Sequence, residues 1–387
     1  MRESSDPGLQ RLPLLDAIRG FCVLQVLIWH YPASLHRIVG HLADLVIRPL
    51  WTVLDWFFVL SGFLLGGILI ENRGARNLLP TFYARRALRI VPVYLILVGY
   101  SWWLHPDDGL LKYFTFTQNM VWAAKEGWGP PEISVTWSLA VEEQFYLVLP
   151  LLVAFLPPRR LPLAAAGLIV LAPLARIYMC LVADNSMAAS ILAVCRMDTL
   201  FMGVLLAHVL RDPAVIRRIE SNRRRLGALV FLLACGFLLY TLSFDGYTDF
   251  AKTLGHTYNG IFYSALLVWL MLVFRDRKLP FVLRVLSWVG LGAYPIYLSH
   301  VAVILAIRPL LGSELKAGLA CAVIITTVSL LSWNLIEKPC IRLGKRIRYR
   351  VPGGAAQLGA AARPSTPSAL AISGSAGSEL IGNSRVT

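Results

Sequence analysis

The chain has 387 residues, of which 57% are hydrophobic and only 15% are charged. Soluble proteins carry roughly 45–50% apolar and about 25% charged residues, so this composition excludes an ordinary soluble domain and indicates a polytopic membrane protein. The net charge of +15 does not indicate nucleic-acid binding, because the basic residues cluster between apolar runs, where they set orientation in the membrane.

Apolar runs of about 20 residues predict an all-α fold, a bundle of ten membrane-spanning helices. The runs cover residues 14–35, 49–70, 84–104, 137–156, 162–182, 189–210, 226–244, 255–274, 283–307 and 315–336. Alternate connecting segments hold most of the Lys and Arg residues. Because basic residues concentrate on the cytoplasmic side, this separation predicts that both termini are cytoplasmic.

The predicted organisation is one transmembrane domain, 14–345, between a cytoplasmic N-terminal segment, 1–13, and a cytoplasmic tail, 346–387. The tail is first basic and then rich in Gly, Ala, Ser and Pro, a composition that predicts disorder. No small-residue cleavage site follows the first run, so we expect that run to be retained and not removed as a signal peptide. The six cysteines lack C-x-x-C spacing, so no metal site is predicted.

The first run contains three ionisable residues, Asp16, Arg19 and His30. Such residues are costly inside a bilayer, so they indicate a functional site or internal partners. An α-helix turns about 100° and rises about 1.5 Å per residue, which puts Arg19 and His30 on one face, roughly 16 Å apart. Asp16 lies one turn from Arg19, at ion-pair spacing. The alternative to a site is a buried ion pair that fixes helix packing.

Polar residues recur in the second and third runs. Asp55 and Ser61 lie in the second, and Asp55 requires a cationic or hydrated neighbour. Arg86 and Arg89 lie one helical turn apart at the cytoplasmic start of the third. Their guanidinium groups could hold the phosphates of an anionic donor such as coenzyme A, or could only set membrane orientation.

Later runs carry further candidates. Glu142 and Glu143 open the fourth run, where we expect them near the outer mouth, orienting a polyhydroxylated acceptor or pairing with an arginine. Arg196 and Asp198 lie in the sixth run. His300, in the ninth, is either a site residue or a buried structural histidine.

The longest outside loop, 105–136, contains Trp122 and Trp128 beside several acidic residues. Aromatic rings at this position could stack on sugars. They are equally typical of the aromatic belt at a membrane interface.

Seven motifs, in this order, resemble the acyltransferase-3 family. They are Leu15-Asp16-Ala17-Ile18-Arg19-Gly20 with His30, the Phe57 to Phe63 run, Arg86-x-x-Arg89 with Pro92, the Trp137 to Tyr146 block, Arg196-x-Asp198, Tyr297-Leu298-Ser299-His300 and Glu337-Lys338-Pro339. The resemblance extends over about residues 10–345. Members of this family O-acetylate surface polysaccharides and other carbohydrates.

The resemblance implies a multi-pass protein of the bacterial inner membrane that uses acetyl-CoA from the cytoplasm as donor and binds no cofactor permanently. It implies that Arg19 and His30 act together in the first helix, with Asp16 beside them, and that Arg86 and Arg89 belong to the donor site. Ala17 stands where the family often has glycine. The fused esterase-like domain of some members is missing from this sequence, so the transfer would finish in the membrane domain or with a separate extracytoplasmic partner.

The resulting hypothesis is transfer of an acetyl group to a hydroxyl of a carbohydrate or lipid-linked glycan. His30 would take the hydroxyl proton as general base, or His30 or a hydroxyl residue would carry the acyl group transiently. The alternative is a transporter or flippase of an anionic or lipid-linked sugar, with Arg19, Arg196 and Glu142 along its pathway. No inverted repeats or matching broken helices are evident in the sequence to favour transport.

Overall fold

The computed structural model describes residues 13–31, 40, 42–244, 248–275 and 277–350, and these residues form helices and connecting turns without any strand. Within these ranges, nine segments are long and apolar enough to cross a membrane, or ten if the bent pair α11 and α12 counts as one. The predicted all-α membrane bundle is thus confirmed. The long helices are α1 (Pro13–His30), α4 (Val53–Glu71), α5 (Leu78–Leu104), α8 (Thr136–Phe155), α9 (Leu161–Leu181), α13 (Arg223–Ser243), α14 (His256–Val273), α16 (Ala293–Ile307) and α17 (Glu314–Ser332).

Shorter elements complete the chain. They are α3 (Leu42–Ile47), η2 (Arg48–Thr52), η3 (Pro106–Asp108), α6 (Leu111–Phe114), α7 (Gln118–Lys125), η4 (Pro131–Ile133), α10 (Ser186–Ile191), η5 (Ala193–Cys195), α11 (Met197–Val209), α12 (Pro213–Ser221), η6 (Ala251–Gly255), α15 (Phe281–Leu291), η7 (Arg308–Leu310), η8 (Trp333–Glu337) and α18 (Lys338–Arg346). The predicted cytoplasmic N-terminal segment, 1–13, and the predicted disordered tail lie almost entirely outside the described residues.

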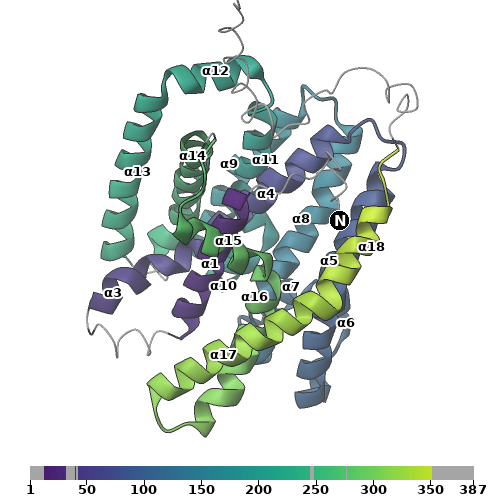
Figure 1. Cartoon of the computed structure of the whole chain (residues 1–387), viewed down its shortest axis with the longest axis vertical. Coiled ribbons are helices and arrows are strands. Elements are labelled where there is room, and N and C mark those ends of the chain that lie inside the picture. The colour runs from purple at the N-terminus through teal and green to yellow at the C-terminus, as the bar shows by residue number, and fades with distance from the viewer. Residues whose placement is uncertain (1–12, 32–39, 41, 245–247, 276, 351–387) are drawn as a thin grey trace, which may run out of the picture.

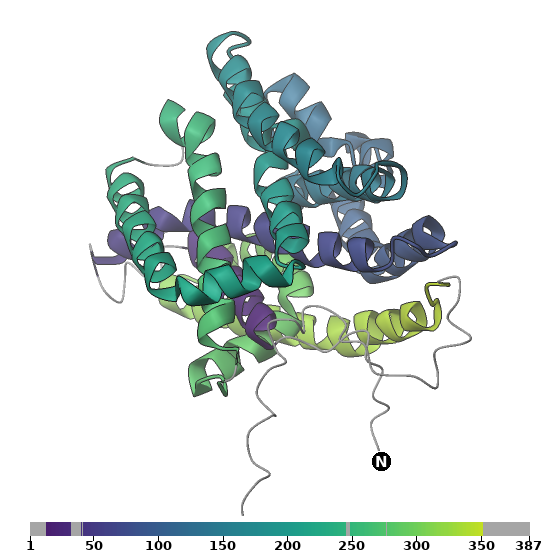
Figure 2. The same cartoon turned by 90° about the horizontal axis from the view of Figure 1, so that it is seen from above.

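Helix α1 lies toward the middle of the bundle, with α13 and α14 on one side and α5, α8 and α9 on the other (Figures 1 and 2). Two main apolar clusters form the core: one joins residues of α5, α8, α9 and α11, and the other joins residues of α1, α13 and α14. Helix α4 contributes to both clusters. Asp55 of α4 is fully buried, Asp16 and Arg19 of α1 are half-buried, and His30 at the end of α1 is exposed.

Two helix crossings are so close that only glycine fits. A Cβ atom on Gly62 of α4 would lie 1.9 Å from the carbonyl oxygen of Leu200, and one on Gly203 of α11 would lie 2.1 Å from that of Val59. Likewise, a Cβ atom on Gly290 of α15 would lie 1.8 Å from the carbonyl oxygen of Asp16. Small residues let membrane helices approach in this way. The second crossing holds α15 directly against the part of α1 that carries Asp16.

The sixth predicted span, 189–210, is not one helix. Helix α10 ends at Ile191, the chain passes through an extended residue and the turn η5, and α11 begins at Met197. Counting apolar residues cannot detect this break, because the interrupted stretch is itself apolar. Irregular backbone is tolerated at membrane depth where protein buries it and supplies hydrogen bonds, and here Arg176 of α9 donates to the carbonyl of Cys195.

The ninth predicted span, 283–307, is also interrupted. Helix α15 ends before Gly292 and α16 begins after it, so the run contains two helices. The last span continues beyond its predicted end at residue 336, through η8 into α18. The protein therefore does contain broken helices, which the sequence did not reveal and which also occur in transporters.

A buried ionic network fixes the interrupted region. Asp55 of α4 is fully buried and its carboxylate accepts from Arg196 Nη2 at 2.6 Å, His256 Nδ1 at 2.9 Å and Asn259 Nδ2 at 2.8 Å. The predicted cationic neighbour of Asp55 is thus Arg196, which directly precedes α11. The network ties α4, the start of α11 and α14 together.

A second ion pair lies beside it. Arg176 is fully buried in α9, and its Nη2 donates to Asp198 Oδ2 at 2.7 Å and to Thr257 Oγ1 at 2.6 Å. Thr257 in turn donates to the same Asp198 oxygen at 2.7 Å. Four long segments therefore meet at two charge pairs, and a charge without its partner at this depth would be costly.

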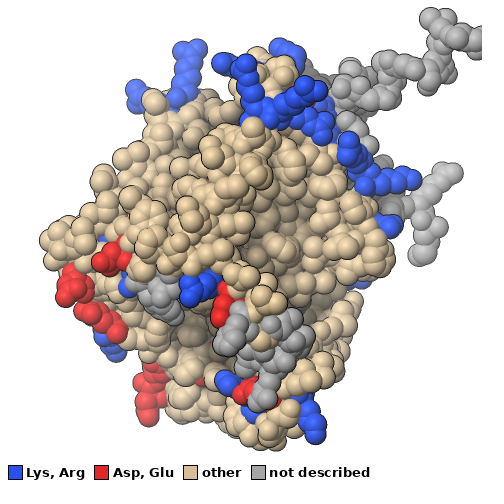
Figure 3. All heavy atoms as spheres, turned by 90° about the vertical axis from the view of Figure 1, so that its left-hand side faces the viewer, with Lys and Arg blue, Asp and Glu red and all other residues tan. Residues whose placement is uncertain are grey.

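Charge is distributed unequally between the two ends of the molecule. On the face shown in Figure 3, Lys and Arg side chains gather at the end that carries α12, and the visible acidic side chains lie toward the opposite end. The start of α5 also lies at the basic end, and the segment after α18 is hydrogen-bonded to it. Arg350 N donates to Asn77 Oδ1 at 2.7 Å, and Asn77 Nδ2 donates to the carbonyl of Arg348 at 2.9 Å.

We expect Asp55→Ala to destabilise the protein strongly, because it leaves Arg196 buried without its counter-charge. Removing one partner of a buried pair costs about 3–5 kcal/mol. The measurement is the thermal unfolding midpoint of the purified protein in detergent.

The matched control is Glu71→Ala, which breaks the 2.8 Å pair with Arg211 at a partly exposed position. Such pairs contribute only about 0–1 kcal/mol. Equal midpoints for the two variants would contradict the structural role of the Asp55 network.

Candidate active site

Helix α1 carries polar groups at two levels. Arg19 Nη1 lies 3.3 Å from Asp16 Oδ1, so the ion pair suggested by their spacing is present. His30 is the last residue of the helix. Eleven residues of helix separate Arg19 from His30, or about 16 Å of rise. The two levels are described in turn.

Three arginines near the start of α5, Arg85, Arg86 and Arg89, differ in their surroundings. Arg85 is engaged by the segment after α18: its Nε donates to the carbonyl of Ile347 at 2.8 Å, and its guanidinium lies 4.9 Å from the Tyr349 ring centre. Arg86 and Arg89 make no hydrogen bond or ion pair with any described residue, and Arg86 contacts only the Phe82 ring face, at 5.8 Å. The two arginines singled out from the sequence are therefore the ones with free donors.

The charges of these arginines act on one another. Arg89 and Arg19 both lie within electrostatic range of Arg86. Like charges that lie close together in a half-buried site repel, and a bound anion relieves that repulsion. Guanidinium groups one turn apart are suited to phosphate, which they bind bidentately. The chemistry of this level of α1 is suited to binding an anion.

Glu142 lies beside two of the arginines and accepts two hydrogen bonds. Ser61 Oγ of α4 donates to its Oε1 at 2.7 Å, and Tyr146 OH donates to its Oε2 at 2.9 Å. Its electrostatic neighbours are Arg19 and Arg86. Ser61 lies about eight residues into α4, so Glu142 of α8 lies level with the middle of that helix. Counting spans does not reveal this depth.

Glu143 takes a different direction from its neighbour, as adjacent residues on a helix must. Its Oε1 atom is buried and lacks a hydrogen-bond partner among the residues that the structure describes. Arg86 and Glu142 are the charged groups that act on it. Because a buried acceptor without a partner is costly, Glu143 is a candidate contact for a ligand that enters beside Arg86.

At the other level, two histidines meet. The rings of His30 and His300 lie edge to face, with their centres 4.7 Å apart. His30 Nδ1 lies 2.9 Å from the carbonyl oxygen of Val26, and His300 Nδ1 lies 2.6 Å from that of Tyr297. A carbonyl oxygen can only accept, so each Nδ1 donates, and each ring in its neutral form carries its lone pair on Nε2. The structure thus brings His300 into the site.

The outer loop contributes less than expected. Trp122 is 2% exposed and Trp128 is 56% exposed, so only Trp128 presents an open ring face. Glu132 is also buried, where it accepts from Ser101 Oγ at 2.6 Å. Burial of Trp122 and Glu132 excludes both from contact with a sugar at the surface and assigns them to folding of the loop.

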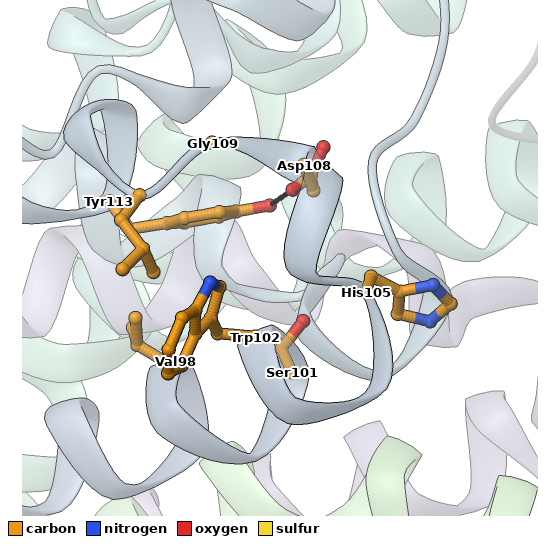
Figure 4. Close-up of a pocket in the computed structure, with 8 residues that line it drawn as sticks. Val98, Ser101, Trp102, His105, Asp108, Gly109 and Tyr113 are labelled. Carbon is orange, nitrogen blue, oxygen red and sulfur yellow. Dashed lines mark hydrogen bonds between the residues drawn. The ribbon is translucent and has the colours of Figure 1, made fainter.

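A small pocket opens at the C-terminal end of α5 (Figure 4). Val98, Ser101, His105 and Tyr113 line it, and the Tyr113 hydroxyl donates to Asp108. Burial, with the nearby Asp108 carboxylate, raises the pKa of Tyr113 above its ordinary value, so the phenol remains a donor. The polar groups of this pocket are already hydrogen-bonded within the protein, so few of them are available to bind a reacting ligand.

Some predicted residues lie apart from these two levels. Asp55, Arg196 and Asp198 belong to the ionic network that fixes α11 and are paired with each other or with Arg176. Sequence reasoning missed Arg176, although an arginine in the middle of an apolar run was a usable signal. It also missed His256, whose importance depends on a contact with a residue 201 positions away.

The comparisons with known proteins agree with the motifs. The family model described as an acyltransferase domain, Acyl_transf_3, matches residues 12–334. No solved structure matches the chain significantly.

Several curated proteins are similar to this chain. The putative peptidoglycan O-acetyltransferase YrhL of Bacillus subtilis (strain 168) is 27% identical over 378 residues, an alignment that covers 87% of this chain and 56% of that protein. The peptidoglycan O-acetyltransferase OatA of Listeria monocytogenes (serovar 1/2a, strain EGD-e) is 25% identical over 346 residues, covering 80% of this chain and 52% of the relative. The O-acetyltransferase OatA of Staphylococcus aureus (strain NCTC 8325) is 26% identical over 328 residues, covering 77% and 51%.

The chain spans about half the length of these curated relatives. The similarity concerns the membrane helices, since the family match runs from the start of α1 to the end of α17. A match over most of its residues shows that this multi-pass membrane chain belongs to the acyltransferase-3 family.

Proposed function

We propose that the protein is a membrane-bound O-acyltransferase that moves an acetyl group from acetyl-CoA to a hydroxyl of a carbohydrate or glycoconjugate. The observation that carries the proposal is the arrangement along α1. Arg86 and Arg89, which have no hydrogen-bond partner among the described residues, lie beside Arg19 at one level. His30, with a free Nε2 atom, ends the helix about 16 Å away. A long, charged donor and a separate hydroxyl acceptor suit these two levels.

On the donor side, Arg86 and Arg89 would hold phosphates of the donor, because their donors are free and one turn apart. Arg19 would bind further polar groups of the donor or help to polarise its thioester carbonyl, with Asp16 holding the guanidinium in place at 3.3 Å. Coenzyme A is a fitting donor because it joins several phosphates to a thioester on a long arm. Its charge prevents it from crossing a bilayer, so it would enter from one side only.

On the acceptor side, His30 is suited to act as general base. Its Nδ1 proton is held by the carbonyl of Val26, which leaves Nε2 as the basic atom. It would remove the proton of the acceptor hydroxyl as the oxygen attacks the thioester carbonyl. The second chemical route, a transient acyl group on His30 or a hydroxyl side chain, predicts a covalent intermediate that labelled donor would reveal.

Peptidoglycan appears in the printed names of two relatives, so a surface polysaccharide or its lipid-linked precursor is the acceptor class we propose. The site would then lie in a bacterial inner membrane. A separate extracytoplasmic partner would complete delivery where the acceptor lies far from the membrane.

For orientation, we infer that the basic end with α12 and the start of α5 faces the cytoplasm. Both chain ends would lie on that side. This inference places the arginine level toward the donor and His30 toward the outside. Tags at the two termini should both be protected in sealed, right-side-out vesicles and cleaved by protease only after permeabilisation.

A transporter of an anionic or lipid-linked sugar is the competing function, since α10 and α11 form a broken helix. The polar groups at that break, however, are consumed by the Asp55 and Asp198 ion pairs. A transporter would relocate its substrate unmodified, so an acetylated product distinguishes the two functions.

We expect His30→Ala to lower acetyl transfer by about 10²- to 10⁴-fold, the usual contribution of a positioned general base. The assay follows labelled acetyl from acetyl-CoA into glycan and lipid-linked material of membranes that carry the full chain. His208→Ala, on the last turn of α11 and away from both levels, is the matched control. Full activity in correctly inserted His30→Ala would refute the catalytic role.

We expect Arg86→Ala and Arg89→Ala each to raise KM for acetyl-CoA, with a smaller effect on kcat. Loss of a charge-assisted hydrogen bond of about 1.5–3 kcal/mol corresponds to roughly 10- to 100-fold in KM. Arg76→Ala is the control, because this exposed residue at the same end uses only its backbone N–H, 3.0 Å from the carbonyl of Arg350. An unchanged KM in the double variant would remove the arginines from the donor site.

A further inference from the structure

We propose that the segment after α18, residues Ile347 to Arg350, forms one side of the donor site, and that the Tyr349 hydroxyl is a further phosphate contact beside Arg86. This segment is called the strap below. The inference rests on the proposed use of acetyl-CoA and adds a binding group to the same site. The strap follows the part of the chain that the family model matches, residues 12–334, so the shared motifs do not indicate it.

Main-chain hydrogen bonds hold the strap against the start of α5. The Asn77 side chain makes two of them: its Oδ1 accepts from Arg350 N at 2.7 Å, and its Nδ2 donates to the carbonyl of Arg348 at 2.9 Å. The backbone N–H of Arg76 donates to the carbonyl of Arg350 at 3.0 Å. In each bond the strap contributes a backbone group, so its path beside α5 does not depend on its own side chains.

These bonds place the Tyr349 ring beside two arginines of α5. Arg85 Nε donates to the carbonyl of Ile347 at 2.8 Å, and the Arg85 guanidinium lies 4.9 Å from the Tyr349 ring centre. Tyr349 also packs, partly buried, against the apolar cluster that contains Phe82, whose ring faces Arg86. Tyr349 and Arg86 lie within electrostatic range of each other. The ring is therefore held next to an arginine that has free donors.

The Tyr349 hydroxyl is a free donor as well. It makes no hydrogen bond with any residue in the part of the chain that the structure describes. Burial raises the pKa of Tyr349 above its ordinary value, although Arg85 and Arg86 oppose the shift, so the phenol keeps its proton. A phenol O–H donates readily to an ionised phosphate oxygen. Tyr349 and Arg86 together thus offer donors of two kinds to one anion.

The strap and the start of α5 carry charges of the same sign. Arg348 and Arg350 make no ion pair with a described residue, and the same holds for Arg86. Glu143 and Glu337 act on the arginines of α5 without bonding to them. Repulsion between these cations opposes docking of the strap, and a bound anion relieves it. By linkage, a docked strap and a bound anion therefore stabilise each other.

The nucleotide end of acetyl-CoA has the chemistry that this group of donors would recognise. It carries several phosphates, and its thioester lies at the far end of a long arm. Arg19 acts on Arg86, and His30 ends the same helix about 16 Å beyond Arg19. Phosphates bound between the strap and α5 would leave the arm free to extend along α1 toward His30. A lipid headgroup also carries phosphate but has no such arm.

The test removes one oxygen atom from the full chain. Tyr349→Phe keeps the ring beside Arg85 and every main-chain bond of the strap. We expect it to raise the dissociation constant for CoA by roughly 10- to 100-fold, the effect of one hydrogen bond to a charged group, as measured by calorimetry in detergent. The dissociation constant for 3′,5′-ADP, which keeps phosphates and lacks the arm, should rise equally. KM for acetyl-CoA should rise while kcat stays unchanged.

The matched control is Tyr83→Phe, the same substitution on α5, where the hydroxyl donates to the carbonyl of Leu147 at 3.2 Å. We expect this variant to bind CoA like the wild type. A second readout is amide hydrogen exchange in the strap, which bound CoA should slow in the wild type. Asn77→Ala, which removes two of the docking bonds, should speed that exchange and weaken CoA binding.

Three results would overturn the proposal. The first is an unchanged dissociation constant for CoA in Tyr349→Phe, which is also expected if the hydroxyl contacts only a lipid headgroup. The second is weaker binding of CoA without weaker binding of 3′,5′-ADP, because the hydroxyl would then not contact a phosphate. The third is strap exchange that CoA does not change. Since none of these measurements needs turnover, wild-type protein that binds CoA but transfers no acetyl group would refute the proposed function alone, whereas wild-type protein that binds no CoA would refute both.

Discussion

The cost of an unpaired charge or polar group inside a membrane governs this structure. An unpaired guanidinium costs little free energy in water. At the centre of a bilayer it costs about 2.5 kcal/mol or more. The chain meets this constraint with paired groups: Asp55 with Arg196, Asp198 with Arg176, Glu142 with Ser61 and Tyr146. Groups that remain without partners are few among the described residues. Arg86, Arg89, Glu143 and the Nε2 atom of His300 are the important ones, and they lie at the two levels of the candidate site.

The fold serves these levels by keeping α1 inside the bundle. Glycine crossings with α15 hold its first half, and contacts with α16 hold its end, where His30 meets His300. Beside it, α4 delivers Ser61 to Glu142 and Asp55 to the ionic network. The interrupted helix α10–α11 has a structural explanation in this arrangement: Arg196 must reach Asp55, and a continuous helix through residues 192–196 would carry its side chain on a different path.

The sequence predicted local features well and distant contacts poorly. The Asp16 to Arg19 pair followed from i, i+3 spacing. The sequence singled out Arg86 and Arg89 by their spacing, whereas nothing local reveals that Arg85 is engaged by residues 262 positions later. Counting apolar residues did not reveal the helix breaks at residues 192–196 and at Gly292, because a break inside an apolar run does not change its hydropathy. The contact of Glu142 with Ser61 depends on the registry of α8 against α4, which the sequence does not reveal.

The contact between the segment after α18 and the start of α5 has a consequence for how the protein is made. Residues Ile347 to Arg350 follow the last membrane helix, and they are hydrogen-bonded to Asn77, Arg76 and Arg85 at the start of α5. Ribosomes make that start well before residues 347–350. The surroundings of Arg85 are therefore complete only after α17 and α18 have been made, so a shorter nascent chain has the arginines but not the Tyr349 side chain that lies against Arg85.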